Sequence, residues 1–170
     1  LTEDALGCRI DARMEAEVVG TTDRGHEVPV ATAALEADGI VVVNRVKPHT
    51  NFSGRVESGL SKMLTVGLGK RAGARAFHEA ALTHGYVDTI ERALDVVRAN
   101  APVIGGVAVV ENFRDRTAHV EGVAAGDLPD AEADLLERAE EYLPTLPFDD
   151  LDALVVEEVG KDVSGSGMDT

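Results

Sequence analysis

Two histidines and a lysine, His49, Lys62 and His78, are the residues of this sequence best placed to do chemistry. They lie in one glycine-rich stretch that follows an apolar, strand-like run just before Asn44. Ligand clefts in open parallel sheets lie at the carboxyl ends of strands. An imidazole in such a place, here in the segment KPHT, can donate or accept a proton near neutral pH. A loop histidine bonded to nearby backbone is the competing interpretation of His49.

The lysine belongs to the segment SGLSKM, where we expect a helix with Ser58 as its N-cap, followed by Gly59. A positive side chain early in a helix meets an unfavourable dipole, so Lys62 is a candidate for binding an anionic or electrophilic ligand. A solvated lysine is the alternative. The segment approaches a nucleotide-phosphate loop, but Leu60 stands where that motif requires its lysine. A backbone cradle for some other phosphate remains open.

The remaining histidines carry weaker signals. His78 lies in a predicted helix, where a lone histidine is more often structural than a metal ligand. His84 precedes a glycine and is typical of a helix carboxyl end, while His26 and His119 fall in a turn and a strand and are interpreted as structural or solvated. The sequence contains no HExxH and no CxxC motif, so it predicts no ordinary zinc site.

The elements that must position these residues alternate along the chain. Helical spacing of apolar residues and uninterrupted apolar runs separate the helices from the buried strands. We expect strands at 27–30, 38–44, 103–111, 117–124 and 151–156, and helices at 58–66, 72–82, 87–99 and 129–143. Strands separated by helices favour an α/β fold with a mostly parallel sheet and helices on both faces.

Composition limits the classes of partner. The chain has 170 residues, 44% of them hydrophobic, and a net charge of −15, which repels nucleic acid phosphates. No apolar run approaches the ~20 residues of a membrane span, and no signal peptide is visible. The single cysteine, Cys8, suggests a reducing compartment. We therefore expect a cytoplasmic protein that binds neither nucleic acid nor membrane.

Taken together, these segments resemble the nickel-dependent lactate racemase family. The similarity runs in order through GTTDRGHEVPV, EADGIVVVNRVKPH and ESGLSKM to a histidine sixteen residues beyond Lys62, which is His78. The stretch EEVGKDVSGSGMD resembles uncharacterised homologues in that family. The combination is fairly specific, although each piece alone would be weak.

The resemblance implies a cofactor and roles for these residues. The family uses a nickel pincer nucleotide derived from nicotinic acid. By the resemblance, Lys62 tethers this nucleotide through a thioamide, His78 binds the nickel, and His49 is one of two histidines that exchange the substrate hydroxyl proton. An imidazole is a suitable nickel ligand.

The resemblance also implies an activity. The protein would be an isomerase, a racemase or epimerase that acts on a 2-hydroxy acid by reversible hydride transfer to the nickel pincer nucleotide. Its partners would be the small-molecule 2-hydroxy acid and the cofactor-maturation enzymes. Ser58 and Gly59 belong to the implied cofactor-binding segment, and Lys161 matches a lysine near the active site. The loop between His49 and Lys62 is longer than in the characterised racemase, so the substrate need not be lactate.

The resemblance further predicts a larger two-domain protein. Residues 1–150 would be the central α/β part of the cofactor-binding domain, and residues 151–170 the start of a truncated second domain. The second catalytic histidine would lie upstream of residue 1, so we expect these 170 residues alone to be inactive. Two alternatives stay open: a non-catalytic α/β module that binds a phosphate- or carboxylate-bearing ligand, and an enzyme of the same fold that epimerises or dehydrates such acids.

Overall fold

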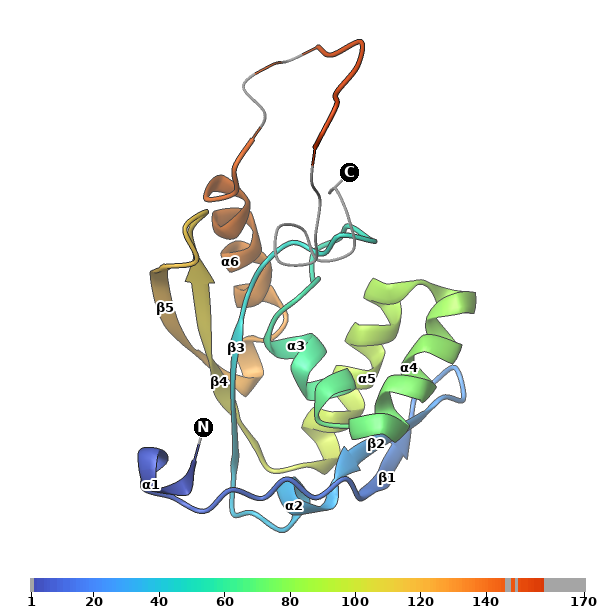
Figure 1. Ribbon diagram of the computed structural model, residues 1–170. Helices are drawn as coiled ribbons and strands as arrows, with labels where there is room; N and C mark the ends of the chain where they lie inside the picture. The colour runs from blue at the N-terminus through green and yellow to red at the C-terminus, as the bar shows by residue number, and fades with distance from the viewer. Residues whose placement is uncertain (1, 146–147, 149, 158–170) are drawn as a thin grey trace.

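A computed structural model describes residues 2–145, 148 and 150–157 of the chain (Figure 1). Its elements, in chain order, are α1 (Glu3–Leu6), β1 (Ala16–Thr21), β2 (Glu27–Ala31), α2 (Thr32–Leu35), β3 (Ile40–Arg45), α3 (Leu60–Lys62), a π-helical turn (Met63–Gly67), α4 (Lys70–His84), α5 (Tyr86–Asn100), β4 (Val103–Glu111), β5 (Thr117–Ala124), a 3-10 turn (Ala125–Asp127) and α6 (Asp130–Glu141).

The strands form two separate sheets of the α/β class. Strands β1 and β2 make an antiparallel hairpin, and the larger sheet has the order β3-β4-β5. In that sheet β3 and β4 pair in parallel, as expected for strands joined by helices, whereas β4 and β5 are antiparallel. A tight turn forces the antiparallel pairing: Asn112 donates its N–H to the Arg116 carbonyl, and Asp115 is left-handed with φ 55°. The sheet is thus mixed, and its predicted mostly parallel character is not confirmed.

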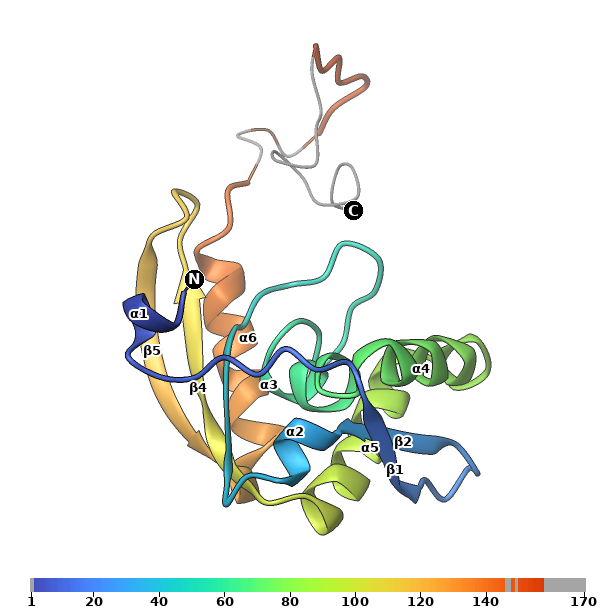
Figure 2. The ribbon, with the colours of Figure 1, turned by 60° about the horizontal axis from the view of Figure 1, so that its bottom comes forward.

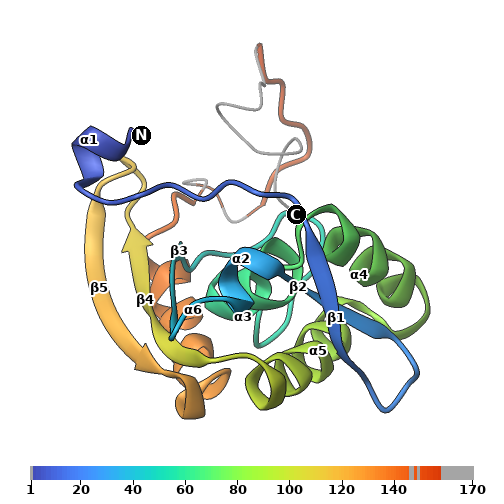
Figure 3. The same ribbon diagram turned by 90° about the horizontal axis from the view of Figure 1, so that it is seen from below.

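The helices gather on one side of the larger sheet. Figure 3 shows α3, α5 and α6 on the same side of β4. The apolar stripe predicted for α5 provides Leu94 and Val97, which are buried in one cluster with Ala108 and Val110 of β4. On the opposite face of β3, the Val41 side chain is 55% exposed and Val43 63% exposed. The expectation of helices on both faces is therefore wrong for β3 in the described part of the chain.

Two local predictions also fail. The expected strand at 151–156 is neither strand nor helix, and Val155 there is 89% exposed. A run of apolar residues becomes a strand only where a neighbouring strand accepts its hydrogen bonds. The proposed second domain, 151–170, lies mostly outside the described residues. The helix after the loop begins with Gly59 as its N-cap, not with Ser58.

The carboxyl end of β3 carries the loop that contains the candidate residues. Val46 extends the parallel ladder by donating its N–H to the Val109 carbonyl, and the chain then leaves the sheet. Figure 2 shows this loop, in cyan, reaching outward from β3 before the chain returns to α3. Among the described residues, no helix is both long and apolar enough to cross a membrane.

Helix α3 approaches the sheet closely because β4 has a glycine beneath it. A Cβ on Gly106 would lie 2.9 Å from Leu60 Cδ1 and 2.7 Å from the Val42 carbonyl oxygen. We therefore expect Gly106→Ala to destabilise the protein by about 1–3 kcal/mol, because neighbouring groups must move apart. Urea unfolding measures this loss. The matched control is Gly122→Ala on β5, where a Cβ meets nothing within 4 Å, and an equal loss in both variants would contradict the packing argument.

Candidate functional site

The loop after β3 is folded around a buried carboxylate. Glu57 is only 3% exposed, and its two oxygens accept the backbone N–H groups of His49, at 2.5 Å, and Gly54, at 2.9 Å. The loop is closed at its base because Lys47 and Ser58 exchange backbone hydrogen bonds of 2.9 and 3.2 Å. Since Glu57 binds its backbone N–H, His49 is held in a defined place at the carboxyl end of β3.

Lys62 is the last residue of α3 and lies partly buried above an aromatic ring. Its Nζ is 5.2 Å from the centre of the Phe52 ring, a cation–π distance. Burial lowers the pKa of the Lys62 amine below its ordinary value, and the nearby negative charge of Glu57 opposes this shift. Lys62 is thus partly buried, not fully solvated.

His49 and His78 border the same aromatic pair. The rings of Phe52 and Tyr86 are stacked, with centres 4.6 Å apart and planes 11° apart. The His49 ring centre is 4.4 Å from that of Phe52. His78 is exposed on α4, and its ring meets Tyr86 edge-on at 6.3 Å. The Phe52–Tyr86 stack thus brings together three candidates that come from a loop and two helices.

Sequence reasoning missed both members of this stack. Aromatic residues make up only 4% of the chain, so an aromatic residue three positions after His49, Phe52, was a usable signal. Tyr86 begins α5 directly after Gly85, which has φ 81° and lets α4 and α5 join through a single residue. Nothing in the sequence near Tyr86 indicated that it would meet the loop.

The other predicted cofactor-binding residues have structural partners here. Ser58 closes the loop through Lys47, and the Gly59 carbonyl accepts a hydrogen bond of 3.0 Å from Asn44 Nδ2. Their contact with a cofactor stays a prediction. Lys161 lies outside the described residues.

A buried glutamate of α6, Glu132, contacts the first turn of α3, the helix that ends at Lys62. Glu132 is 1% exposed, and its Oε2 accepts hydrogen bonds from the Ser61 backbone N–H, at 2.8 Å, and from Ser61 Oγ, at 2.5 Å. Burial raises the pKa of Glu132 above its usual value, and the bonds from Ser61 work in the opposite direction. In a chain with 31 acidic residues, no pattern singled this one out.

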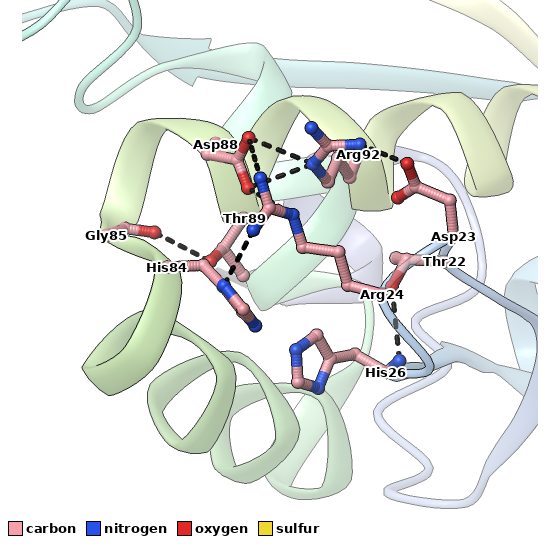
Figure 4. Close-up of polar contacts among 9 residues, drawn as sticks. All are labelled: Thr22, Asp23, Arg24, His26, His84, Gly85, Asp88, Thr89 and Arg92. Carbon is pink, nitrogen blue, oxygen red and sulfur yellow. Dashed lines mark hydrogen bonds and ion pairs between the residues drawn. The ribbon is translucent and has the colours of Figure 1, made fainter.

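A second polar cluster lies between the β1–β2 hairpin and the corner of α4 and α5 (Figure 4). The ring centres of His26 and His84 lie 5.1 Å apart with their planes tilted by 58°, and Arg24 donates to His84 Nδ1 at 2.9 Å. The Asp88 carboxylate accepts hydrogen bonds from both Arg24 and Arg92. Asp23 accepts a further hydrogen bond from Arg92, so two carboxylates balance the two arginines, which supports the structural interpretation of both histidines.

A small cavity accompanies this second cluster. Its volume is ≈ 20 Å³, enough for about one water molecule. The Nε2 atom of His26 is buried there without a hydrogen-bond partner in the structure. The cavity is lined by Phe77 on the α4 side, and neither His49 nor Lys62 lines it. Among the residues that the structure describes, no group of three or more His, Cys, Asp or Glu side chains is arranged to hold a metal ion.

Comparison with models of known protein families gave no match, and comparison with curated proteins gave none either.

We predict that Glu57→Gln loosens the loop that holds His49. A glutamine amide has one oxygen, so the backbone N–H of either His49 or Gly54 loses its acceptor, at a cost of about 1–3 kcal/mol. Hydrogen exchange should become faster at one of these two amides. Glu17→Gln, on the exposed face of β1, is the control and should leave both exchange rates unchanged.

Glu132→Gln tests the burial of the carboxyl group. Because the folded-state pKa lies above the usual 4.5, the folded protein binds this proton more tightly than the unfolded chain does. The stability of the unmodified protein, relative to Glu132→Gln, should then fall as the pH rises from about 4.5 and level off above the raised pKa. Urea unfolding of both proteins at a series of pH values measures the difference, and a difference that does not vary with pH would contradict a raised pKa.

Proposed function

We propose that this chain is the central part of the cofactor-binding domain of a racemase or epimerase that acts on a 2-hydroxy acid with a nickel pincer nucleotide. The supporting observation is the gathering of His49, Lys62 and His78 around the Phe52–Tyr86 stack. The residues come from the loop after β3, from α3 and from α4, so their sequence order alone does not require them to meet.

The environment of Lys62 suits covalent attachment of a cofactor. An amine forms an amide-type bond through its neutral form, and burial increases the neutral fraction of Lys62 at a given pH. Lys47 is exposed on the same loop. Lys62 is therefore the lysine that we assign as the tether.

The aromatic stack suits a flat ring beside that tether. Offset aromatic rings attract each other, and Phe52 and Tyr86 already lie nearly parallel. Lys62 and His78 would hold the nucleotide, with the imidazole of His78 as nickel ligand. The chemistry that the nucleotide supplies when bound is the reversible acceptance of a hydride from the 2-carbon of the hydroxy acid.

His49 is the residue that we assign to the proton of the substrate hydroxyl group. That proton must leave when the hydride leaves and return with it, which requires an acid–base group near neutral pH. The backbone N–H of Asn51 donates to His49 Nδ1 at 3.1 Å, and Glu57 holds the His49 backbone. These two bonds fix the orientation of the imidazole that would exchange the proton.

Mass spectrometry of the attached cofactor tests the assignment. We expect that the protein, produced together with the cofactor-maturation enzymes, carries an adduct on the peptide that contains Lys62. The adduct should be absent from Lys62→Arg and retained in Lys47→Arg, because Lys47 is exposed on the loop. An active preparation with unmodified Lys62 would rule out the tether.

The nickel content of the same preparations distinguishes the enzyme from the alternative, a module that binds a phosphate- or carboxylate-bearing ligand. His78→Ala should lose most of its nickel while keeping the adduct on Lys62, since the two residues hold different parts of the cofactor. Glu79→Ala, on the neighbouring exposed position of α4, is the control and should keep its nickel. Nickel content and nucleotide binding that both survive His78→Ala would favour the module.

A further inference from the structure

Helix α3 begins without a cap of its own. Its N-cap residue, Gly59, has no side chain and so provides no capping hydrogen bond. The first residues of the helix, Leu60 and Ser61, are both 0% exposed. Water therefore cannot satisfy the backbone N–H groups that every helix leaves unpaired at its amino end. Another part of the chain has to supply the acceptor.

Glu132 supplies that acceptor from α6, 71 residues further along the chain. Its carboxylate accepts hydrogen bonds from both the backbone N–H and the hydroxyl group of Ser61. A carboxylate at the amino end of a helix also interacts favourably with the helix dipole. The contact is buried, so water does not compete for the same hydrogen bonds.

The contact leaves little freedom in where the helix starts. A Cβ on Gly59 would lie 2.0 Å from Glu132 Oε1, so the carboxylate is in direct contact with the glycine backbone. On the other side, Asn44 at the end of β3 donates to the Gly59 carbonyl. Gly59 is thus held between β3 and α6. Lys62 follows three residues later. The rise and rotation per residue of the helix fix where Lys62 lies along the helix axis and which way its side chain points, relative to Gly59.

We propose that Glu132 is a positioning residue for Lys62: by capping α3 against Gly59 it holds the lysine amine above the Phe52 ring. Glu132 does not touch the ring or the amine and acts through the start of the helix. The catalytic meaning of this role rests on the proposed function of Lys62. The positioning role concerns where the Lys62 amine lies, and this position can be tested in the cofactor-free protein.

The two oxygens of Glu132 predict which substitutions preserve the role. Both hydrogen bonds from Ser61 go to Oε2, while Oε1 has no hydrogen-bond partner in the structure. Glutamine can place its single amide oxygen at the Oε2 position and its nitrogen at the Oε1 position. Aspartate keeps the charge but is one carbon shorter and cannot reach Ser61 from the same backbone position. Comparing the glutamine and aspartate variants therefore separates the effect of side-chain length from the effect of charge.

The experiment measures the pH dependence of acylation at each lysine, by peptide mass spectrometry on the cofactor-free protein. In the unmodified protein and in Glu132→Gln, the midpoint for Lys62 should lie below the ordinary lysine value, because Lys62 is partly buried. In Glu132→Asp the amine should become more exposed, and its midpoint should rise toward the ordinary lysine value of about 10.4. Glu137→Asp, at an exposed position on α6, is the matched control and should leave the Lys62 midpoint unchanged.

Gly59→Ala tests the same contact from the other side and should also raise the Lys62 midpoint, because its Cβ would displace the carboxylate. The proposal is overturned if Lys62 keeps its midpoint in a folded Glu132→Asp or Gly59→Ala. It is equally overturned if a folded Glu132→Gln raises the midpoint, since glutamine retains the reach. A missing adduct on Lys62 with these shifts intact would instead reject the proposed function and leave the positioning role standing.

Discussion

Carboxylates that leave water must find hydrogen-bond donors, and two buried glutamates find them in the backbone around the candidate site. Glu132 binds the first turn of α3 through Ser61, and Glu57 binds the loop that carries His49. Each bond satisfies a carboxylate oxygen and a backbone N–H that would otherwise be costly to bury. If the Glu132 contact were lost, α3 would have no cap, and the start of this helix between β3 and α4 would no longer be fixed in place.

The same contacts explain how a loop without regular secondary structure can hold side chains in fixed positions. The chain from Val46 to Gly59 contains no helix and no extended strand, yet it is closed at Lys47 and Ser58 and filled by Glu57. Beneath it, Val56 is buried in a small apolar cluster with Phe77 and Ile90, against which Phe52 and Tyr86 pack. The site therefore rests on helices α4 and α5, and its loop is fixed by buried polar bonds.

The arrangement also connects electrostatics to the proposed chemistry. Burial lowers the pKa of Lys62, and the negative charge of Glu57 opposes this shift. A partly buried amine beside an aromatic stack, with its pKa lowered by burial, is the feature that supports the proposed covalent attachment of a flat cofactor. The second cluster, around His26 and His84, has its arginines paired with Asp23 and Asp88 and joins the hairpin to the helices.

The local elements were predictable from the sequence: these are the apolar stripe of α5, the buried run of β4 and the place of the His49 loop after β3. These features follow from periodicity and turn chemistry within a few residues. Three features could be known only from the folded chain: β5 runs antiparallel to β4, one face of β3 is left uncovered, and Phe52 stacks on Tyr86. The contact of Glu132 with Ser61 belongs to the same class. A local pattern specifies which face of an element is buried but not which distant side chain it is buried against, and both contacts join residues far apart in the chain.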